Sequence, residues 1–394
     1  MNDLGTVLVV FGDALSAPES CYSLMESGFS VVALCRKNQP CGIRKSKRVS
    51  TVDVFPPEID YERCLNEIEA ASQKYNAIAV LPLDDVSLWI LNKGRSRFTC
   101  SVVIPDTDAV TVALDKRLQI SAAADAGFDV PTTAHSTDSL STWTCYPSIV
   151  KGSLACDLNG DGIGKSKVHF CRNQSDLEHT GFQFGPNNDL ILQEWHQGTG
   201  VGVFGIRTKD GITGWSGHRR IRMMNPAGSG SSCCESENPS LDIRNKVERF
   251  LASIEWTGIF MIELLRDTSG VEWFMELNGR TWGSTALARA QGLEFPSWAV
   301  MCALGMNPDI PSATTADPVK ARHLGRECIH WMHAMRGPGK HTGLPWPSRL
   351  RTTCDLLFSS GNSHWYNFRK EDRSVFWSDT LSTIKSQIRK RPAQ

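Results

Sequence analysis

Short hydrophobic runs alternate with amphipathic stretches over the first 105 residues of the chain. Runs rich in Val, Ile and Leu predict strands at residues 7–11, 31–35 and 77–81. Stretches with helical spacing predict helices at residues 18–27 and 61–74. Strands that alternate with helices form a parallel sheet covered by helices. The first turn lacks the Gly-x-Gly-x-x-Gly pattern, so this α/β region shows no recognisable dinucleotide site.

Small and acidic residues follow the predicted strands of this region. Ligands of open parallel sheets lie beyond the carboxyl ends of the strands. We therefore expect four residues near any crevice of the sheet, namely Gly12, Asp13, Asp84 and Asp85. Asp is also a common residue at the start of a helix, so Asp84 and Asp85 can equally cap an apolar helix at residues 86–92.

Beyond a turn-rich joint at residues 105–108, the pattern predicts a helix over 109–127 that ends at a glycine. A short apolar strand then delivers Lys151 at its end, where a buried ammonium needs a negative partner. Residues 157–165 resemble a calcium loop, but the twelfth position is Val168 and a strand follows it. We interpret the loop as a mobile lid in which Gly162 and Gly164 let backbone N–H groups approach a phosphate.

A hairpin with one acid in each strand is predicted at residues 258–280. Glu276 and Asn278 share a face because side chains alternate along a strand, and pairing can bring Glu263 opposite them. Burying unpaired carboxylates among apolar residues is costly, whereas Mg²⁺ removes that cost. Arg280 adds a positive charge on the same face, where a phosphoryl group would develop negative charge. The alternative is a surface hairpin whose acids pair with Lys or Arg.

Arg219, Arg220 and Arg222 form a basic run before a small, flexible loop at residues 225–232. A solvated basic face is one interpretation of this run. Bidentate recognition of a phosphate or carboxylate is the other, because the planar guanidinium suits both groups.

Composition narrows the class of protein. The 394 residues are 41% hydrophobic and 21% charged, with 42 basic against 42 acidic side chains, which indicates a globular protein without the charge of a nucleic-acid binder. Such a length suits two or three subdomains. Thirteen cysteines without a Cys-x-x-Cys motif indicate reduced thiols and a cytoplasmic location. The balanced charge favours small-molecule partners. No leader or membrane-spanning segment is indicated.

The sequence resembles the ATP-grasp superfamily over residues 105–305. Its metal-binding end is matched by Glu263 followed, thirteen residues on, by Glu-Leu-Asn-Gly-Arg. Leu-Asp-Lys-Arg at 114–117 and the strand ending at Lys151 resemble the segments that deliver the two phosphate-binding lysines. Residues 190–196 resemble the link between the lobes that clamps adenine. The ribose-binding Glu of many relatives is replaced by a glycine-rich segment at 198–202.

The resemblance implies a role for each candidate residue. The metal ligands would be Glu263, Glu276 and Asn278, holding Mg²⁺ or Mn²⁺. The residues at the transferred phosphoryl group would be Arg280, Arg219, Arg220 and Arg222. The ATP contacts would be Lys116, Lys151, Gly162, Gly164, Gln193, Glu194, Trp195 and His196.

We therefore expect an α/β protein of the α+β ATP-grasp type, with an N-terminal parallel α/β pre-ATP-grasp domain followed by a two-lobed ATP-grasp domain. The expected boundaries are 1–105 for the Rossmann-like substrate-side domain, 106–195 for the small lobe with its phosphate lid, 196–310 for the large lobe with the metal site, and 311–394 for a C-terminal appendage. Four tryptophans predict that the appendage is packed, namely Trp331, Trp346, Trp365 and Trp377. Residues 381–391 predict a basic helix, either a solvated terminus or a partner contact.

The activity that the resemblance implies is an ADP-forming ligase that joins a small carboxylate to an amine through an acyl phosphate. Two alternatives stay open, activation of an enol or bicarbonate oxygen and a nucleotide-binding regulator without turnover. A homodimer is the common default for soluble enzymes.

Overall fold

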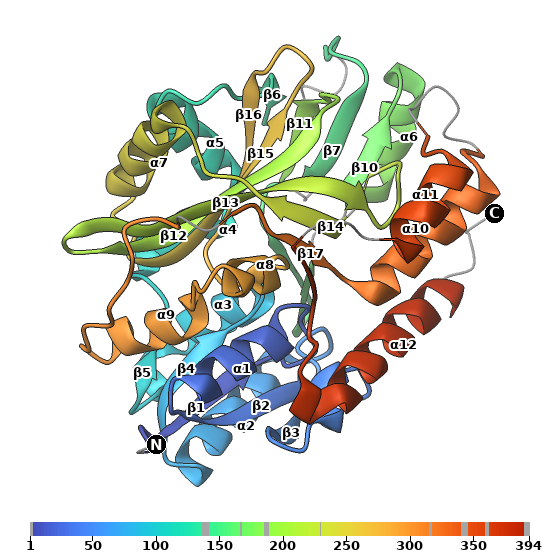
Figure 1. Ribbon diagram of the computed structural model, residues 1–394. Coiled ribbons are helices and arrows are strands. Elements are labelled where there is room, and N and C mark those ends of the chain that lie inside the picture. The colour runs from blue at the N-terminus through green and yellow to red at the C-terminus, as the bar shows by residue number, and fades with distance from the viewer. Residues whose placement is uncertain are drawn as a thin grey trace.

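The computed structural model describes residues 3–135, 142–165, 168–184, 189–228, 230–314, 317–339, 346–358 and 362–389. Its N-terminal part is a five-stranded parallel sheet in the order β3-β2-β1-β4-β5 (Figure 1). The strands are β1 (Thr6–Val10), β2 (Ser30–Arg36), β3 (Ser50–Val54), β4 (Ala77–Pro82) and β5 (Ser101–Val102). The helices are α1 (Ala17–Glu26), α2 (Tyr61–Lys74) and α3 (Asp85–Lys93). The predicted parallel α/β region is confirmed, although polar β3 and two-residue β5 escaped the hydrophobic pattern.

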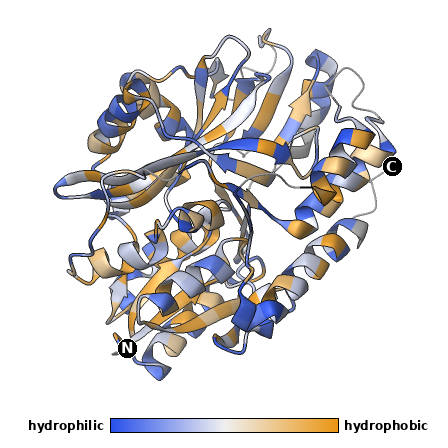
Figure 2. Cartoon of the chain, viewed as in Figure 1, coloured by the Kyte–Doolittle hydropathy of each residue, from blue (hydrophilic) through white to orange (hydrophobic). Residues whose placement is uncertain are grey.

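The strands of this sheet are hydrophobic along most of their length (Figure 2). Val7 and Val9 of β1 pack into one buried cluster and Leu8 and Val10 into another, so both faces of the sheet are covered. This pattern is expected of a parallel sheet, because crossover helices lie on its faces. The carboxyl ends of β1 and β4 lie side by side, and this edge faces the rest of the molecule.

The helix predicted at 109–127 is wrong as a single element. It is divided into α4 (Thr107–Leu114) and α5 (Lys116–Asp125). Asp115 between them is extended, with φ −111° and ψ 110°, and its side chain caps α5 by accepting a hydrogen bond from the Arg117 N–H. The Lys116 N–H bonds to the carbonyl of Ser153 at 2.8 Å instead of continuing the first helix. The break therefore places Lys116 at a helix start beside the strand that carries Lys151.

The next part contains a four-stranded antiparallel sheet in the order β10-β7-β11-β6. Its strands are β6 (Thr133–Ala134), β7 (Ser148–Gly152), β10 (Val168–Cys171) and β11 (Leu190–Glu194), accompanied by α6 (Gln174–Phe184). Between β7 and β10 the chain forms a separate hairpin of β8 (Cys156–Asn159) and β9 (Gly162–Lys165). Strands, and not helices, flank the loop that resembled a calcium site, so its rejection as an EF-hand is confirmed.

A seven-stranded sheet in the order β16-β15-β12-β13-β14-β17-β18 crosses the middle of the molecule (Figure 1). Its strands are β12 (Thr199–Thr208), β13 (Gly211–Met223), β14 (Ser231–Ser236), β15 (Gly258–Arg266), β16 (Glu272–Asn278), β17 (Lys320–Arg322) and β18 (Ser363–Trp365). One face packs against α5 and α7 (Leu241–Ser253) through a cluster that includes Phe250 and Phe274. The other packs against α8 (Thr285–Ala290) and α9 (Phe295–Ala303) through Phe204 and Phe295.

The C-terminal residues are part of this architecture. Strands β17 and β18 extend the seven-stranded sheet, and α10 (Leu324–Arg336), α11 (Arg349–Leu357) and α12 (Arg373–Arg389) lie beside it (Figure 1). Val375 of α12 packs into the core of the N-terminal sheet. The packed appendage is therefore confirmed, but Trp331 and Trp377 are 36% and 54% exposed, and the buried residues are others, such as Tyr366 and Phe376. No helix among the described residues has the length and hydrophobicity that crossing a membrane requires.

Candidate active site

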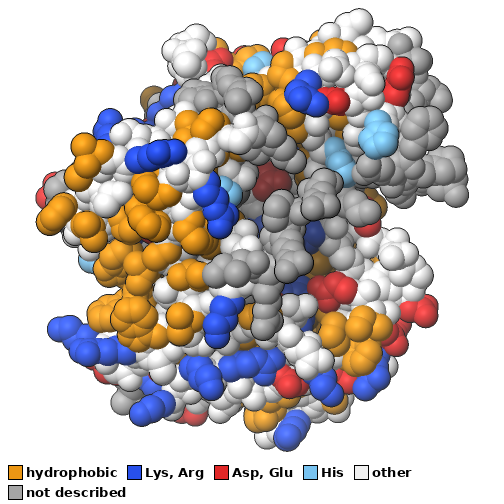
Figure 3. Space-filling model, turned by 90° about the vertical axis from the view of Figure 1, so that its right-hand side faces the viewer, with side chains coloured by type: hydrophobic (Ala, Val, Ile, Leu, Met, Phe, Trp, Pro, Cys, Tyr) orange, Lys and Arg blue, Asp and Glu red, His pale blue; other side chains and the backbone are white. Residues whose placement is uncertain are grey.

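A cavity of about 570 Å³ lies where the carboxyl ends of β1, β2 and β4 face the seven-stranded sheet. Figure 3 shows a hollow on one face of the molecule with acidic and basic side chains at its depth. Asp13 and Asp84 line the cavity from the N-terminal side, as the rule for parallel sheets predicts. Five of the predicted site residues line it from the other side, namely Glu263, Glu276, Asn278, Arg280 and Arg220.

The acids of the predicted hairpin face each other. Glu263 of β15 is paired in register with Glu276 of β16, and the amide of Asn278 donates to Glu276 Oε1 at 3.3 Å. Burial and the neighbouring carboxylate of Glu263 raise the pKa of Glu276. Two carboxylates that repel each other in a half-buried place are relieved by a bound cation.

The residues present fit a magnesium ion. Within the described part of the chain, no group of three or more His, Cys, Asp or Glu side chains is arranged to hold a metal. Two carboxylates with one amide oxygen suit Mg²⁺, because proteins often hold this ion through one or two carboxylates and leave its other positions to phosphate oxygens and water. The pair Glu263 and Glu276, with Asn278, is therefore the candidate metal site.

Arg280 is fixed by Asp85, the first residue of α3. Its Nε and Nη2 donate to the two carboxylate oxygens of Asp85 at 3.0 and 3.1 Å, a bidentate pair. Asp84, the preceding residue, caps α3 by accepting from the Ser87 N–H, so the capping interpretation is confirmed for it. Its other oxygen accepts from Arg36 at 2.6 Å. The two adjacent acids therefore hold one arginine each at opposite sides of the helix start.

Lys151 is nearly buried on β7, with 9% of its surface exposed. Its ammonium donates to the side-chain oxygen of Gln193 on β11 at 2.9 Å. Burial lowers the pKa of Lys151 to about 8, against the opposing charges of Glu276 and Glu263. A buried cation beside carboxylates, but bonded only to a neutral amide, is suited to receive an anionic ligand.

Lys116 approaches the same region from the start of α5. Its ammonium donates to the carbonyls of Leu154 and Gly152 at 3.0 and 3.3 Å. Burial lowers its pKa, while the charges of Glu276 and Asp85 act in the opposite direction. Neither lysine lines the cavity. Both nevertheless interact electrostatically with Glu276, which does line it.

The predicted adenine link lies at the end of β11. The Gln193 side chain is buried, bonded to Lys151 and to Thr133, and Glu194 accepts from Thr132. The backbone N–H of Trp195 donates to the Pro147 carbonyl at 3.0 Å. The His196 ring stacks on Trp273 at a centroid distance of 4.0 Å. The side chains of this link therefore bond or stack within the protein.

The glycine-rich hairpin β8–β9 contacts the N-terminal sheet domain. The N–H of Ile163 donates to the Pro57 carbonyl at 2.8 Å, and a Cβ at Gly162 would lie 2.2 Å from the Glu58 carbonyl oxygen. Gly162 is thus needed for this close approach, whereas Gly164 has open space around it. The hairpin ends at Lys165, which lines the cavity. Its charge helps to lower the pKa of Asp85 against the effect of burial.

The three arginines of the basic run point to different places, and of the three only Arg220 lines the cavity. Arg219 pairs in register with Val201 and therefore points to the sheet face opposite Arg220, where it binds Glu235 and Glu237. Arg220 lines the cavity and donates to Glu263 at 2.5 Å.

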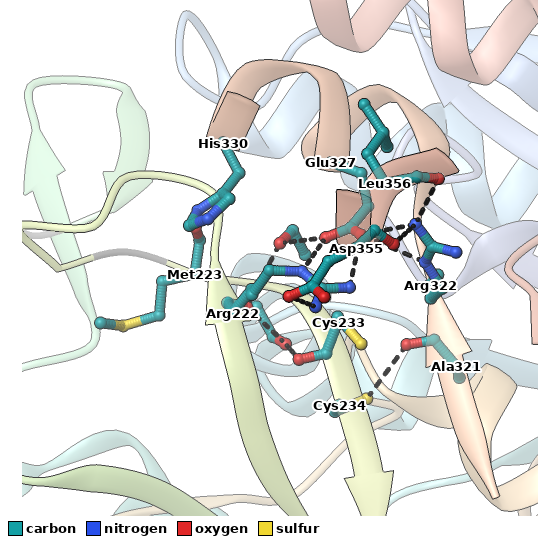
Figure 4. Close-up of polar contacts among 12 residues, drawn as sticks. Arg222, Met223, Cys233, Cys234, Ala321, Arg322, Glu327, His330, Asp355 and Leu356 are labelled. Atoms are coloured by element: carbon teal, nitrogen blue, oxygen red, sulfur yellow. Dashed lines mark hydrogen bonds and ion pairs between the residues drawn. The ribbon is translucent and has the colours of Figure 1, made fainter. Parts of the chain in front are cut away.

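Arg222 lies beyond a bulge in β13 and pairs with buried Glu327 of α10 at 2.7 Å. Figure 4 shows Glu327 between Arg222 and Arg322. The hydrogen bonds and charges of the arginines outweigh the effect of burial, so the pKa of Glu327 lies below its ordinary value. Arg222 therefore serves to fix α10 on the sheet and does not line the cavity.

Two glycines of β12 make room for the side chains that reach the acids. Gly202 stands between Glu263 and His218 in the register, so these three positions form one row across the sheet. A Cβ at Gly202 would lie 2.5 Å from His218 Cε1, and one at Gly200 would lie 2.6 Å from Arg220 Cδ. Because β12 separates β13 from β15, a side chain there would block Arg220 from Glu263. The glycine-rich segment thus has a steric role.

The loop predicted at residues 225–232 follows β13. Gly230 and Ser231 line the cavity. The residues before them form a turn in which the Gly228 N–H donates to the Asn225 carbonyl. Ser229 lies outside the described residues.

No model of a known protein family matches the sequence, and a search of curated proteins finds no match. Solved structures do match. N5-carboxyaminoimidazole synthetase from Staphylococcus aureus is similar with a TM-score of 0.61 and 14% identity, over 85% of this chain and 87% of that chain. L-amino acid ligase from Bacillus licheniformis is similar with a TM-score of 0.59 and 14% identity, over 77% and 75% of the two chains.

A third similar structure is the biotin carboxylase domain of 2-oxoglutarate carboxylase from Hydrogenobacter thermophilus, solved with MgADP, ADP and bicarbonate. The TM-score is 0.59 and the identity 15%, over 80% of this chain and 73% of that chain. The chain has the ATP-grasp fold. The expected fold class is thereby confirmed, with a parallel sheet in the N-terminal region and antiparallel sheets after it.

Within the ATP-grasp fold, the sequence pattern assigned no role to Lys165 and Arg326, which line the cavity, or to Gly200 and Gly202 of β12. Lys165 follows the glycine-rich loop directly, and this position was a readable signal. Gly200 and Gly202 are two residues apart, so they lie on the same face of a strand, and that face carries no side chains at these positions. Arg326 had no such signal, because it lies in α10, beyond the stretch that resembled the family.

A larger cavity of about 840 Å³ lies between the β12–β13 turn and α9. It is lined by none of the predicted site residues. Its charged lining residues, Arg207, Lys209 and Asp210, include one acid only. The smaller cavity, which holds the facing carboxylates, is therefore the candidate active site.

Proposed function

We propose that this protein is an ATP-dependent ligase that forms a C–N amide bond between a small carboxylate and an amine, releasing ADP and phosphate. The observation that carries the proposal is the facing pair Glu263 and Glu276, with Arg280 beside it and the buried Lys151 and half-buried Lys116 nearby. Phosphoryl transfer depends mainly on positioning and charge, and such a cluster supplies both.

Each group of residues has a place in this proposal. Glu263, Glu276 and Asn278 hold Mg²⁺ or Mn²⁺, which when bound neutralises phosphate oxygens and favours attack on phosphorus. Lys116 and Lys151 bind the ATP phosphates, and Gly162 and Gly164 cover them through the β8–β9 hairpin. The link of Gln193, Glu194, Trp195 and His196 borders the adenine, with backbone groups doing the recognition because the side chains are engaged within the protein.

The reaction proceeds in two displacements. A carboxylate oxygen of the first substrate attacks the γ-phosphorus, the bond to the β–γ bridging oxygen breaks, and ADP leaves with that electron pair. The amine then attacks the carbonyl carbon of the acyl phosphate, phosphate leaves and the amine loses a proton. Arg280 and Arg220 face the space where charge develops on the transferred group. Arg219 and Arg222 have no part in these steps.

The setting follows from the same observations. The N-terminal domain, proposed at 1–105, supplies Asp13 and Asp84 to the substrate side of the cavity. The lobes are proposed at 106–195 and 196–310, and residues 311–394 complete the wall of the cavity. Thirteen unbridged cysteines fit a reducing compartment, and we propose the cytoplasm. Small molecules are the proposed partners, and a homodimer is the proposed assembly.

The test is release of ADP and phosphate with Mg²⁺ and ATP across pools of amino acids and small carboxylates. The critical variant is Glu276→Gln, and Glu248→Gln on the exposed side of α7 is the matched control. The proposal requires ADP and phosphate that depend on two pooled components, persist in the control and disappear in Glu276→Gln. AMP and pyrophosphate would mean adenylation and would refute the phosphoryl-transfer mechanism. Phosphate release that needs bicarbonate would favour carboxylation.

A further inference from the structure

Arg326 lines the candidate active site from α10 and differs from the other deeply placed arginines. Arg36, Arg222, Arg280 and Arg289 each form an ion pair with at least one carboxylate. The guanidinium of Arg326 instead donates to a neutral group, from Nη1 to the Ser231 carbonyl at 3.0 Å. Among the described residues, Arg326 has no ion-pair partner.

The electrostatics of Arg326 are also unlike those of its counterparts. Burial and the nearby charge of Arg220 lower the pKa of Arg326, whereas carboxylate partners raise the pKa values of Arg36, Arg222 and Arg280. The acid whose charge acts on Arg326 is Asp379, which is already engaged by His323 at 2.9 Å. A guanidinium held in such a place without a counter-charge is costly unless an anion joins it.

The fold holds Arg326 firmly at this position. The next residue, Glu327, is buried between Arg222 of β13 and Arg322 of β17, and its Oε1 also accepts from Ser232 at 2.7 Å (Figure 4). The backbone N–H of Arg326 is itself bonded at the start of α10, to His323 Nδ1. The backbone position of Arg326 is therefore set before any ligand arrives.

Arg326 and the metal site lie at different ends of the cavity. The guanidinium contacts Ser231 on β14, whereas Glu263 lies on β15, three strands away in the order β15-β12-β13-β14. Neighbouring strands are about 4.8 Å apart, so the two strands are about 14 Å apart. Arg220 lies on β13, between these two strands, and its side chain reaches Glu263. A ligand that contacts both the metal site and Arg326 has to extend past Arg220, which favours a molecule longer than bicarbonate.

We propose that Arg326 binds a second carboxylate of the substrate, one that is not phosphorylated during the reaction. The substrate class is then a dicarboxylic acid or an amino acid whose reacting group lies at the far end of the molecule. This inference rests on the proposed ligase function and names one of its substrates. Of the other groups close to Arg326, Tyr366 and the Ser231 carbonyl are neutral. Arg220 is paired with Glu263, and Asp379 is paired with His323. One guanidinium therefore matches the single charge of a carboxylate better than the nearly double charge of a phosphate ester.

The first measurement is binding without turnover. Wild-type protein with MgADP is titrated by calorimetry with glutarate, glutamate, butyrate and glycerol 3-phosphate. We expect glutarate or glutamate to bind at least tenfold more tightly than butyrate. Arg326→Met should remove this preference, Arg326→Lys should restore part of it, and Arg63→Met, an exposed arginine of α2, should leave it intact.

Stability measurements distinguish a binding role from a structural one. Because Arg326 has no charged partner, Arg326→Met without ligand should have a urea midpoint equal to or above that of the wild type. A lower midpoint would assign a structural role to Arg326 and overturn the proposal. Unchanged diacid binding in Arg326→Met, tighter binding of glycerol 3-phosphate than of the diacids, or no binding of the panel to the wild type would also overturn it. Arg326-dependent binding with no ADP release in any pool would instead refute the ligase function alone.

Discussion

Replacing Lys151 by Met should stabilise the ligand-free protein and abolish its affinity for ATP. Burial lowers the pKa of Lys151 from an ordinary value of 10.5 to about 8, so its charged form is disfavoured in the folded state. One pKa unit corresponds to about 1.4 kcal/mol, which gives a cost of about 3 kcal/mol at pH 7. Met has a similar length and no charge, but Gln193 loses a hydrogen bond worth about 1 kcal/mol. The expected net gain is about 2 kcal/mol.

The sign of the pH dependence follows from the lowered pKa. Between pH 8 and pH 10.5 the unfolded chain still holds the proton that the folded protein has lost, so the contribution of Lys151 to stability rises with pH. Below pH 8 both states are protonated and the cost is constant. The advantage of Lys151→Met over the wild type should therefore be largest at neutral pH and disappear towards pH 10.5.

Urea unfolding followed by tryptophan fluorescence measures this difference in matched buffers of increasing pH. Comparing variant with wild type cancels the titration of other groups. In a parallel thermal melt, MgATP should raise the melting temperature of the wild type and leave that of Lys151→Met unchanged. A variant less stable than the wild type at neutral pH, or a difference that does not shrink with pH, would refute the assignment of a buried, charged lysine awaiting an anion.

Further predictions follow from three other sites. Gly202→Ala should push His218 aside, lower the free energy of unfolding by about 1–3 kcal/mol and abolish ATPase activity. Urea unfolding and ADP release measure these two effects. An unchanged stability and activity would contradict the steric role of Gly202. Glu327→Gln should destabilise the protein by about 3 kcal/mol because the buried charge of Arg322 then lacks its acidic partner and Arg222 loses one of two. A change below about 0.5 kcal/mol in urea would count against this anchor. Because the pKa of Glu276 is raised, Mg²⁺ should bind more weakly at about pH 5 than at about pH 8, and the protein should take up a proton when Mg²⁺ dissociates. Calorimetry in two buffers would detect this proton uptake. A pH-independent affinity for Mg²⁺ would exclude Glu276 as a ligand.

Local spacing was sufficient for the parts of the site that belong to one hairpin or one strand. The face-to-face placement of Glu263 and Glu276 follows from two runs joined by a short turn, because alternation and pairing act over a few residues. Lys151 at the end of an apolar strand was readable for the same reason. The hydrophobic runs of the N-terminal sheet likewise predicted its α/β class and the crevice at Asp13 and Asp84.

Tertiary structure decided which charges meet. Arg219 and Arg220 are neighbours in the sequence, but strand alternation sends them to opposite faces, and bare glycines on β12 let only Arg220 reach Glu263. Arg326 enters the cavity because Glu327 anchors α10 across more than one hundred residues of intervening chain to Arg222. The hydrophobic periodicity predicted a helix that continues through Asp115. The helix ends there because the N–H of the next residue, Lys116, donates to the carbonyl of Ser153.

The sequence by itself therefore determined the class of fold and the acid hairpin, because both arise from periodicities of two and 3.6 residues that repeat within short segments. The composition of the cavity wall was decided only when distant segments packed together. Charge pairing depends on distances between side chains from separate strands and helices, and these distances are set by register, bulges and helix docking. Register, bulges and helix docking cannot be read from the local pattern of hydrophobic and polar residues.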